Sequence, residues 1–168
     1  MILLLDERQR KELAQYSPYI AIPKVSSQNR RYIPMDYLEG EIIPGDKLFT
    51  MPSATSYEFG KLMSNVHMAW TRAVCGRLKS DYSYSNTIVY NNFPWPSPTK
   101  AILNARALYP DSNLADLYDP LTMPTELLKA HNANNRAVMD AYGFSIKMSE
   151  ADCVAELMRM YQKLTKEK

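Results

Sequence analysis

Apolar residues recur every three or four positions between about residue 56 and residue 75. Such spacing is typical of a helix with one buried face. Thr55 and Glu58 match the capping box that begins many helices, and Gly76 stands where the pattern stops. The pattern predicts one long helix over 56–75, whose buried stripe comprises Phe59, Leu62, Met63, Val66, Trp70 and Val74.

Short runs of β-prone residues lie on both sides of this helix. Prolines and polar turns separate these runs, among them the SSQN turn at 26–29 and a Pro-Gly-Asp turn at 44–46. A stretch of helical composition at 5–16 precedes the first run and ends before Pro18. The strands that we expect are, in chain order, 19–22, 31–33, 38–43, 47–51, 79–84 and 87–90.

The pattern changes after a stiff passage that contains Pro94, Pro96 and Pro98, which we interpret as a domain boundary. Beyond it, every element is helical. The helices that we expect are 101–109, a short one from Asp111 or Ser112 to Tyr118, a long one from Pro124 to Gly143, and a last one from Ser149 to about Thr165. We therefore predict an α+β protein, with a small mixed α/β domain over 1–98 and an all-α helical bundle over 99–168.

The composition indicates a folded protein with little net charge. Of its 168 residues 46% are apolar, and the formal charge is +2. Cys75 and Cys153 belong to no CxxC motif, so we expect buried free thiols and no metal site. The opening apolar run of four residues is too short for a signal peptide or a membrane span, which predicts a soluble, cytoplasmic protein. Because the chain begins so abruptly, we expect a piece of a longer polypeptide.

Catalytic motifs are missing from the sequence. It contains no HExxH, GxSxG, GxGxxG or P-loop motif. Glu39 and Glu41 could act as an acid/base pair, but a solvated strand face explains them better. The residues NFPW at 92–95 share their types with the Asn-Pro-Pro-aromatic loop of amino-methyltransferases, although the order differs. We assign no catalysis and no cofactor to this chain.

The run GRLKSDYSYSNT at 76–87 carries the most informative charges. If 79–84 is one strand, Lys79, Asp81 and Ser83 share a face. A lysine can donate to guanine O6 and N7 and an aspartate can accept from cytosine N4, so this face could read a G·C pair in the major groove. Lys24 with Asp46 would repeat the pairing, and Lys47 lies next to Asp46.

Groups suited to phosphate oxygens surround these positions, among them Arg30, Arg31, Arg77, Ser26, Ser27 and Asn86. The spacing alone favours a simpler alternative, an ordinary surface ion pair that contributes less than about 1 kcal/mol.

Longer blocks of sequence resemble a known family. YIP at 32–34, TSYEFGKLMSNVHMAW at 55–70, GRLKSDYSYSNT at 76–87 and NNFPWP at 91–96 resemble the target-recognition domain of MmeI-like restriction-modification proteins. The block at 107–131 is similar to the C-terminal helical domain that follows it there. The resemblance assigns 1–98 to target recognition and 99–168 to the helical domain.

The resemblance also implies a function. The parent would be an N6-adenine DNA methyltransferase that uses S-adenosylmethionine, acts on double-stranded DNA in the cytoplasm at the nucleoid, and often carries an endonuclease. This chain would be its C-terminal part, beside the methyltransferase domain of the same polypeptide. Base choice would rest on Lys24 with Asp46, Lys47 with Ser83, and Lys79 with Asp81.

Two alternatives stay open at this point. The chain could be a protein–protein interaction module without DNA specificity, or a small enzyme that uses some of its carboxylates. One departure from the family also matters, because the link SPTKAILNAR at 97–106 is shorter than in the relatives. Either this loop is short or residues are missing near 99–101.

Overall fold

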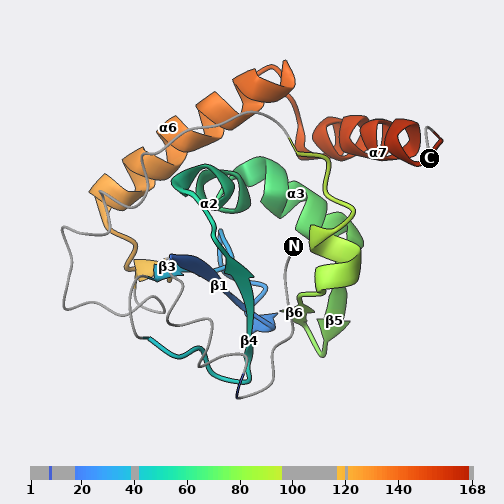
Figure 1. The fold of residues 1–168 in the computed structure, drawn as a ribbon. Helices are drawn as coiled ribbons and strands as arrows, with labels where there is room; N and C mark the ends of the chain where they lie inside the picture. The colour runs from blue at the N-terminus through green and yellow to red at the C-terminus, as the bar shows by residue number, and fades with distance from the viewer. Residues whose placement is uncertain (1–7, 9–17, 39–41, 96–116, 120, 167–168) are drawn as a thin grey trace.

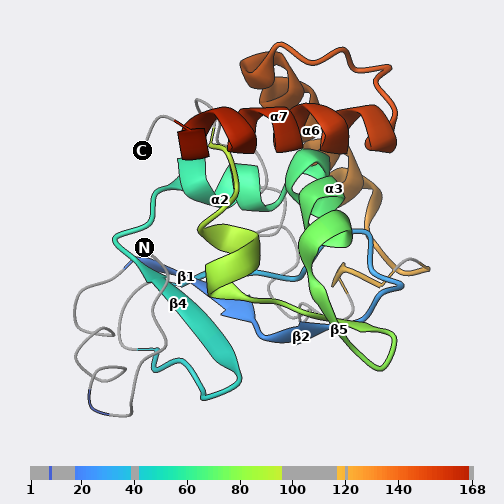
Figure 2. The same cartoon turned by 90° about the vertical axis from the view of Figure 1, so that its right-hand side faces the viewer.

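A computed structural model describes residue 8 and residues 18–38, 42–95, 117–119 and 121–166 of the chain. It contains two small antiparallel sheets and a set of helices, so the predicted α+β class is confirmed. The central sheet has the order β3 (Asp36–Leu38), β1 (Tyr19–Pro23), β4 (Leu48–Pro52). The surface sheet has the order β2 (Val25–Ser26), β6 (Asp81–Ser83), β5 (Gly76–Leu78). Figure 2 shows the main helices in a layer on one side of the strands.

The central sheet forms around β1, four of whose five residues are buried. Its antiparallel register places Ile20 opposite Met51 and Ile22 opposite Phe49, which brings apolar side chains into one core. The strands predicted at 19–22 and 47–51 are confirmed within one residue.

Two other strand predictions for this region are wrong. Tyr32 and Ile33 are buried without any strand pairing, and the third strand of the sheet is β3, beyond Pro34. The apolar character of these two residues reflects burial in the core, which short irregular segments can also provide. Of the run predicted at 38–43, Leu38 ends β3, residues 39–41 lie outside the described residues, and Ile42 and Ile43 are exposed and outside any strand.

The long helix predicted over 56–75 is two helices, α2 (Ser56–Leu62) and α3 (Asn65–Val74). The capping box at the start of α2 is confirmed, since the Thr55 hydroxyl accepts from the Tyr57 amide and Glu58 accepts from the Thr55 amide. Ser64 causes the break. Its hydroxyl donates to the Lys61 carbonyl at 2.6 Å and accepts from the His67 amide at 3.2 Å, so it ends one helix and caps the next.

The segment after α3 differs from the prediction at two places. The single strand expected at 79–84 is a hairpin, in which Lys79 and Ser80 form the turn between β5 and β6. The strand expected at 87–90 is a one-turn π-helix, η1 (Asn86–Tyr90), capped by the Ser85 hydroxyl. The Trp70 indole donates to the Val89 carbonyl at 2.9 Å and so fixes η1 against α3.

The last two helices are confirmed as α6 (Thr125–Tyr142) and α7 (Glu150–Lys166). Gly143 ends α6 with φ 70°, a left-handed conformation that favours glycine. The helix expected at 101–109 lies outside the described residues, as does the one expected at 111–118 except for the buried Leu117 and Tyr118.

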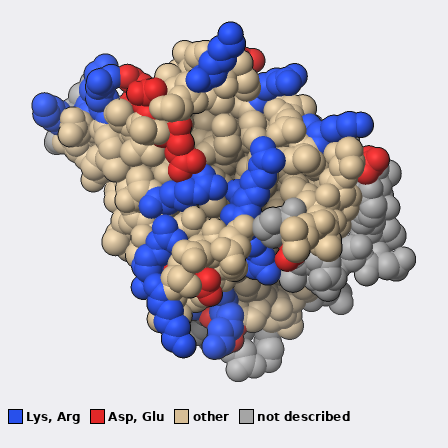
Figure 3. All heavy atoms as spheres, turned by 180° about the vertical axis from the view of Figure 1, so that it is seen from behind, with Lys and Arg blue, Asp and Glu red and all other residues tan. Residues whose placement is uncertain are grey.

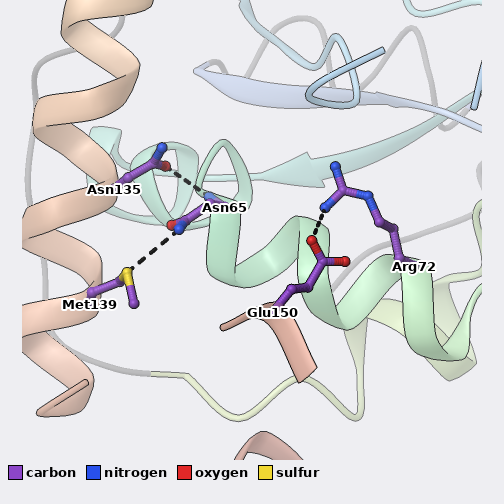
Figure 4. Close-up of polar contacts among 5 residues, drawn as sticks. All are labelled: Asn65, Arg72, Asn135, Met139 and Glu150. Carbon is purple, nitrogen blue, oxygen red and sulfur yellow. Dashed lines mark hydrogen bonds and ion pairs between the residues drawn. The ribbon is translucent and has the colours of Figure 1, made fainter. Parts of the chain in front are cut away.

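The described C-terminal helices pack on α2 and α3. Contacts join α6 to both of these helices and α7 to α3. In Figure 4, Asn65 of α3 faces Asn135 and Met139 of α6, while Arg72 of α3 pairs with Glu150 of α7 at 2.9 Å. One cluster of buried apolar residues includes side chains from both sides of residue 98. The domain division at that residue stays a prediction.

None of the helices in the described part of the chain has the length and apolar character needed to cross a membrane.

Candidate nucleic-acid interface

The surface sheet has one covered face and one open face. The strand register places Ser26 opposite Tyr82, and both residues are buried, each with an exposed fraction of 3%. The alternate positions point the other way, because successive residues in a strand face opposite sides. The open face therefore carries Val25, Ser83 and Gly76 in one row, and Leu78 with Asp81 in the next.

Lys79 and Asp81 lie together at the end of the hairpin, although not as predicted. Lys79 is exposed in the turn with φ 56°, and Asp81 begins β6 opposite Leu78. The expectation that Lys79, Asp81 and Ser83 share a strand face is therefore wrong for Lys79, because the turn intervenes. Asp81 and Ser83 do share the open face. Within the described part of the chain no ion pair joins Lys79 to Asp81, so the simple surface pair is not formed.

The loop at 27–30 supports this end of the hairpin. The Gln28 amide donates to the Asp81 carboxylate at 3.4 Å, while the amides of Asn29 and Arg30 both donate to Ser27 at 3.3 Å. The sequence predicted phosphate contacts from Ser26 and Ser27 of this turn but gave Gln28 no role, although a glutamine side chain can bond to adenine in the major groove.

Lys24 joins the two sheets. Its ammonium donates to the Asp46 carbonyl at 2.6 Å, and its amide donates to the Lys47 carbonyl at 3.0 Å. Its own carbonyl accepts from the Tyr84 amide at 2.8 Å, next to Ser83. The structure thus brings Lys24 to Asp46 and Lys47, and places Ser83 beside them. Lys24 binds the backbone of Asp46, so the exposed Asp46 carboxylate is left for other contacts.

The residues expected to bind phosphate differ in their exposure and in their contacts. Arg77 is exposed, with its guanidinium 4.1 Å from the centre of the Tyr82 ring. Arg31 donates to the Asn132 side chain of α6 at 3.3 Å, and Asn86 is half-buried at the start of η1. Ser26 is buried on the covered face, which argues against the phosphate contact predicted for it, so we omit it from the interface.

The charge distribution fits a weakly basic surface. Figure 3 shows Lys and Arg side chains over much of the face opposite to that of Figure 1, close together in its lower part. Asp and Glu side chains lie between them. A surface of this kind attracts polyanions without a large net charge.

A second feature is a cavity of about 300 Å³ lined by Met51, Tyr57, Glu58, Lys61, Tyr90 and Trp95. The buried Lys61 ammonium lies 3.3 Å from the centre of the Tyr57 ring and 5.1 Å from that of Trp95. Burial lowers the pKa of Lys61 to about 8. The Lys61 ammonium has no hydrogen-bond partner among the described residues.

The remaining titratable and motif residues have packing roles. Burial lowers the pKa of His67 to about 3, and its Nε2 lies 3.0 Å from the Tyr84 hydroxyl, so His67 is structural as expected. Phe93 of the NFPW run is buried against His67, Trp70 and Tyr142. Cys153 is buried and Cys75 is half-buried, and both are free thiols. The described residues contain no cluster of three metal-ligating side chains.

Comparisons with known proteins agree on one family. Residues 5–97 match the family model described as MmeI, target recognition domain, and residues 97–167 match MmeI, C-terminal domain. The chain is 38% identical over 168 residues to DNA methyltransferase A of Bacillus subtilis (strain 168), which covers 94% of this chain and 19% of that protein.

Among solved structures, the chain resembles the type IIL restriction-modification enzyme MmeI in complex with DNA. The TM-score is 0.82 and the identity is 43%, over 89% of this chain and 22% of that chain. The chain thus spans about a fifth of the length of these relatives.

Proposed function

The chain belongs to the MmeI family, through both its target recognition domain and its C-terminal domain, and from this membership we propose that it selects the DNA sequence on which a larger enzyme acts. That enzyme is an N6-adenine DNA methyltransferase of a restriction-modification system, and this chain is the part that reads double-stranded DNA. The observation that carries the proposal is that Asp81 and Ser83 share the open face of the surface sheet, next to Lys79 in the hairpin turn. Lys24 contacts Asp46 and Lys47 at the junction of the two sheets.

The hairpin of the surface sheet suits the major groove, which is wide enough for a two-stranded ribbon. Lys79 at the turn donates to O6 and N7 of a guanine, and Asp81 accepts from N4 of the paired cytosine. The β5–β6 pairing holds their backbone, and the Gln28 backbone amide donates to the Asp81 carboxylate, so the two side chains are presented from an ordered hairpin. Lys24 with Asp46, and Lys47 with Ser83, read further base pairs from the junction of the two sheets.

Phosphate contacts set the position of the hairpin in the groove. Arg77 lies in β5 and Arg30 in the loop after β2, and Ser27, Arg31 and Asn86 supply further donors. Such contacts carry little sequence information, but they add affinity that falls as salt rises.

The methyl transfer takes place elsewhere in the polypeptide. The methyltransferase domain binds S-adenosylmethionine, which supplies the methyl group, and that domain takes the target adenine out of the base stack. Nothing in the sequence of this chain supplies a cofactor-binding glycine loop, and its NFPW residues are occupied in packing. The work of this chain is to orient that domain over the chosen site, in the cytoplasm where the DNA lies.

A charge swap tests the proposal. We expect Lys79→Glu with Asp81→Arg, made in the complete polypeptide that carries this chain, to invert one G·C pair of the recognition sequence to C·G. Sequencing of methylated sites in cellular DNA measures the change. A matched control is Lys129→Glu with Asp140→Arg, two exposed residues of α6, which should leave the sites unchanged.

The result can also refute the proposal. Unchanged sites with normal methylation in the Lys79/Asp81 variant would remove these two residues from base reading. DNA binding that does not weaken with salt, or no DNA binding at all, would favour the protein–protein interaction module.

A further inference from the structure

Two large apolar side chains occupy the open face of the surface sheet. Leu78 is 57% exposed and Val25 is 43% exposed. Leu78 lies directly opposite Asp81, and Val25 lies directly opposite Ser83. The face that carries two proposed base readers is therefore half apolar.

Gly76 keeps this face flat. It lies opposite Ser83 and two residues before Leu78, so its missing side chain would stand on the same face. An added Cβ would meet only the Ser83 carbonyl oxygen at 3.9 Å, which is ordinary contact, and Gly76 does not have a positive φ. Neither the backbone nor the internal packing requires glycine here. A glycine inside a strand often marks a place where another molecule approaches closely.

The surroundings of Leu78 indicate which molecule approaches. Lys79, an exposed cation, follows Leu78 in the hairpin turn, and Asp81 lies directly opposite Leu78. An apolar side chain next to two proposed base readers suits a polyanion that also carries apolar groups. In the major groove of duplex DNA, the C5-methyl group of thymine is such a group.

We propose that Leu78 selects a thymine by apolar contact with its C5-methyl group, in the base pair next to the one read by Lys79 and Asp81. This inference rests on the proposed function. It adds a specificity residue of a different chemical kind, because Leu78 distinguishes bases by a methyl group and not by hydrogen bonds. Because Gly76 has no side chain, the edge of the base can reach the Leu78 side chain.

Uracil-containing duplexes test this contact, since uracil differs from thymine only by the C5-methyl group. The site of the complete polypeptide is first mapped, and each thymine in it is then replaced singly by uracil. We expect wild-type binding to fall about fourfold at one thymine, which corresponds to about 0.8 kcal/mol for one buried methyl group. Leu78→Ala should bind the thymine and uracil duplexes equally at that position.

Two further variants sharpen the test. Ile88→Ala removes an apolar side chain that is 50% exposed on η1, outside the sheet, and should keep the fourfold difference. Gly76→Val should fold, because the space above Gly76 is open, but should weaken binding to every duplex by keeping the groove at a distance.

Several results would overturn the inference. They are a recognition site without thymine beside the G·C pair, equal wild-type binding to thymine and uracil there, or a difference that persists in Leu78→Ala. If the charge swap at Lys79 and Asp81 still changes the site in these cases, only the role of Leu78 is lost. If the complete polypeptide shows no sequence-specific DNA binding, the proposed function fails together with it.

Discussion

The two sheets of this molecule have the same number of strands and the same antiparallel pairing, yet their exposure is opposite. In the central sheet, β1 and β4 are buried along most of their length. In the surface sheet, all three residues of β5 are exposed. A three-stranded antiparallel sheet thus forms part of the core in the central sheet, and presents exposed side chains in the surface sheet.

The difference follows from what covers each sheet. The central sheet contributes Ile20, Ile22 and Phe49 to the cluster that the helices complete. The surface sheet contributes Tyr82 from its covered face, whereas Leu78 and Val25 on its open face are largely exposed. These two exposed residues can therefore change without repacking a core, which suits the DNA-reading role proposed above.

The largest expected effect is a difference between the two sheets in how much a substitution lowers the free energy of unfolding. Ile20 of β1 is fully buried, so Ile20→Ala should lower the free energy of unfolding by about 2–5 kcal/mol. Val25→Ala in the surface sheet also shortens a β-branched side chain, but Val25 is 43% exposed, and the loss should stay near 0.5 kcal/mol. Urea unfolding of the 168-residue chain measures both. Equal losses would mean that the open face is packed in solution.

The same contrast explains how far the sequence could predict the structure. The helical character of 56–75 and of the last two helices was predicted correctly because their apolar residues recur at helical spacing. The strand at 19–22 was predicted from a short β-prone run that ends at a proline. The break at Ser64 was missed because one side-chain hydroxyl decided it, inside an apolar stripe that continues across the break. The hairpin turn at Lys79 was missed because Lys79 and Ser80 include no glycine or asparagine, the residues that usually mark a two-residue hairpin turn.

The candidate site was predicted in part. The family resemblance implied the pairs Lys24 with Asp46 and Lys47 with Ser83, and the structure brings Lys24 to Asp46 and to Lys47 through backbone atoms. No periodicity links residues so far apart in the chain. The burial of Ser26 could not be foreseen, because in a strand of two residues the pattern does not show which side faces the core.

A smaller effect tests how α6 is attached to the body of the protein. The buried Asn135 donates to the Tyr32 hydroxyl at 2.7 Å and accepts from the Asn65 amide at 2.8 Å, the second contact being drawn in Figure 4. Asn135→Ala leaves both partners unsatisfied and should cost about 1–3 kcal/mol in the free energy of unfolding. Asn132→Ala, at an exposed position of the same helix, should cost less than about 0.5 kcal/mol. A large loss in the Asn132 variant would show that its contact with Arg31 holds α6 instead.

Lys61 allows a test by pH within the buried region. Its pKa is lowered by burial from 10.5 to about 8, so between these values the unfolded chain binds more protons than the folded chain. The free energy of unfolding attributable to Lys61 should therefore rise with pH from about 8 to 10, with a slope of at most about 1.4 kcal/mol per pH unit. Below pH 8 the ammonium is charged in both states and the cost of burying it is fully present.

The Lys61→Met variant isolates this contribution. Burial raises the pKa of Cys153 to about 11 and that of Tyr90 to about 12, and these groups lower stability as pH rises. They are present in both proteins, so the difference between wild type and Lys61→Met reports Lys61 alone. A difference that stays constant from pH 7.5 to 10 would mean that the Lys61 amine reaches solvent.

A small effect on stability is expected at Arg77, where the effect on DNA binding should be clear. Arg77→Gln removes the stacking of the guanidinium on Tyr82, an exposed cation–π contact that contributes about 0.5–1 kcal/mol. If Arg77 binds a phosphate, the slope of log affinity against log salt should fall by about 1, equally for all sequences. Arg136→Gln, at an exposed position of α6, serves as the control and should leave the slope unchanged. An unchanged slope in Arg77→Gln would contradict a phosphate contact of Arg77. Base reading by the surface sheet would still stand, and the phosphate contacts would then lie elsewhere in the polypeptide.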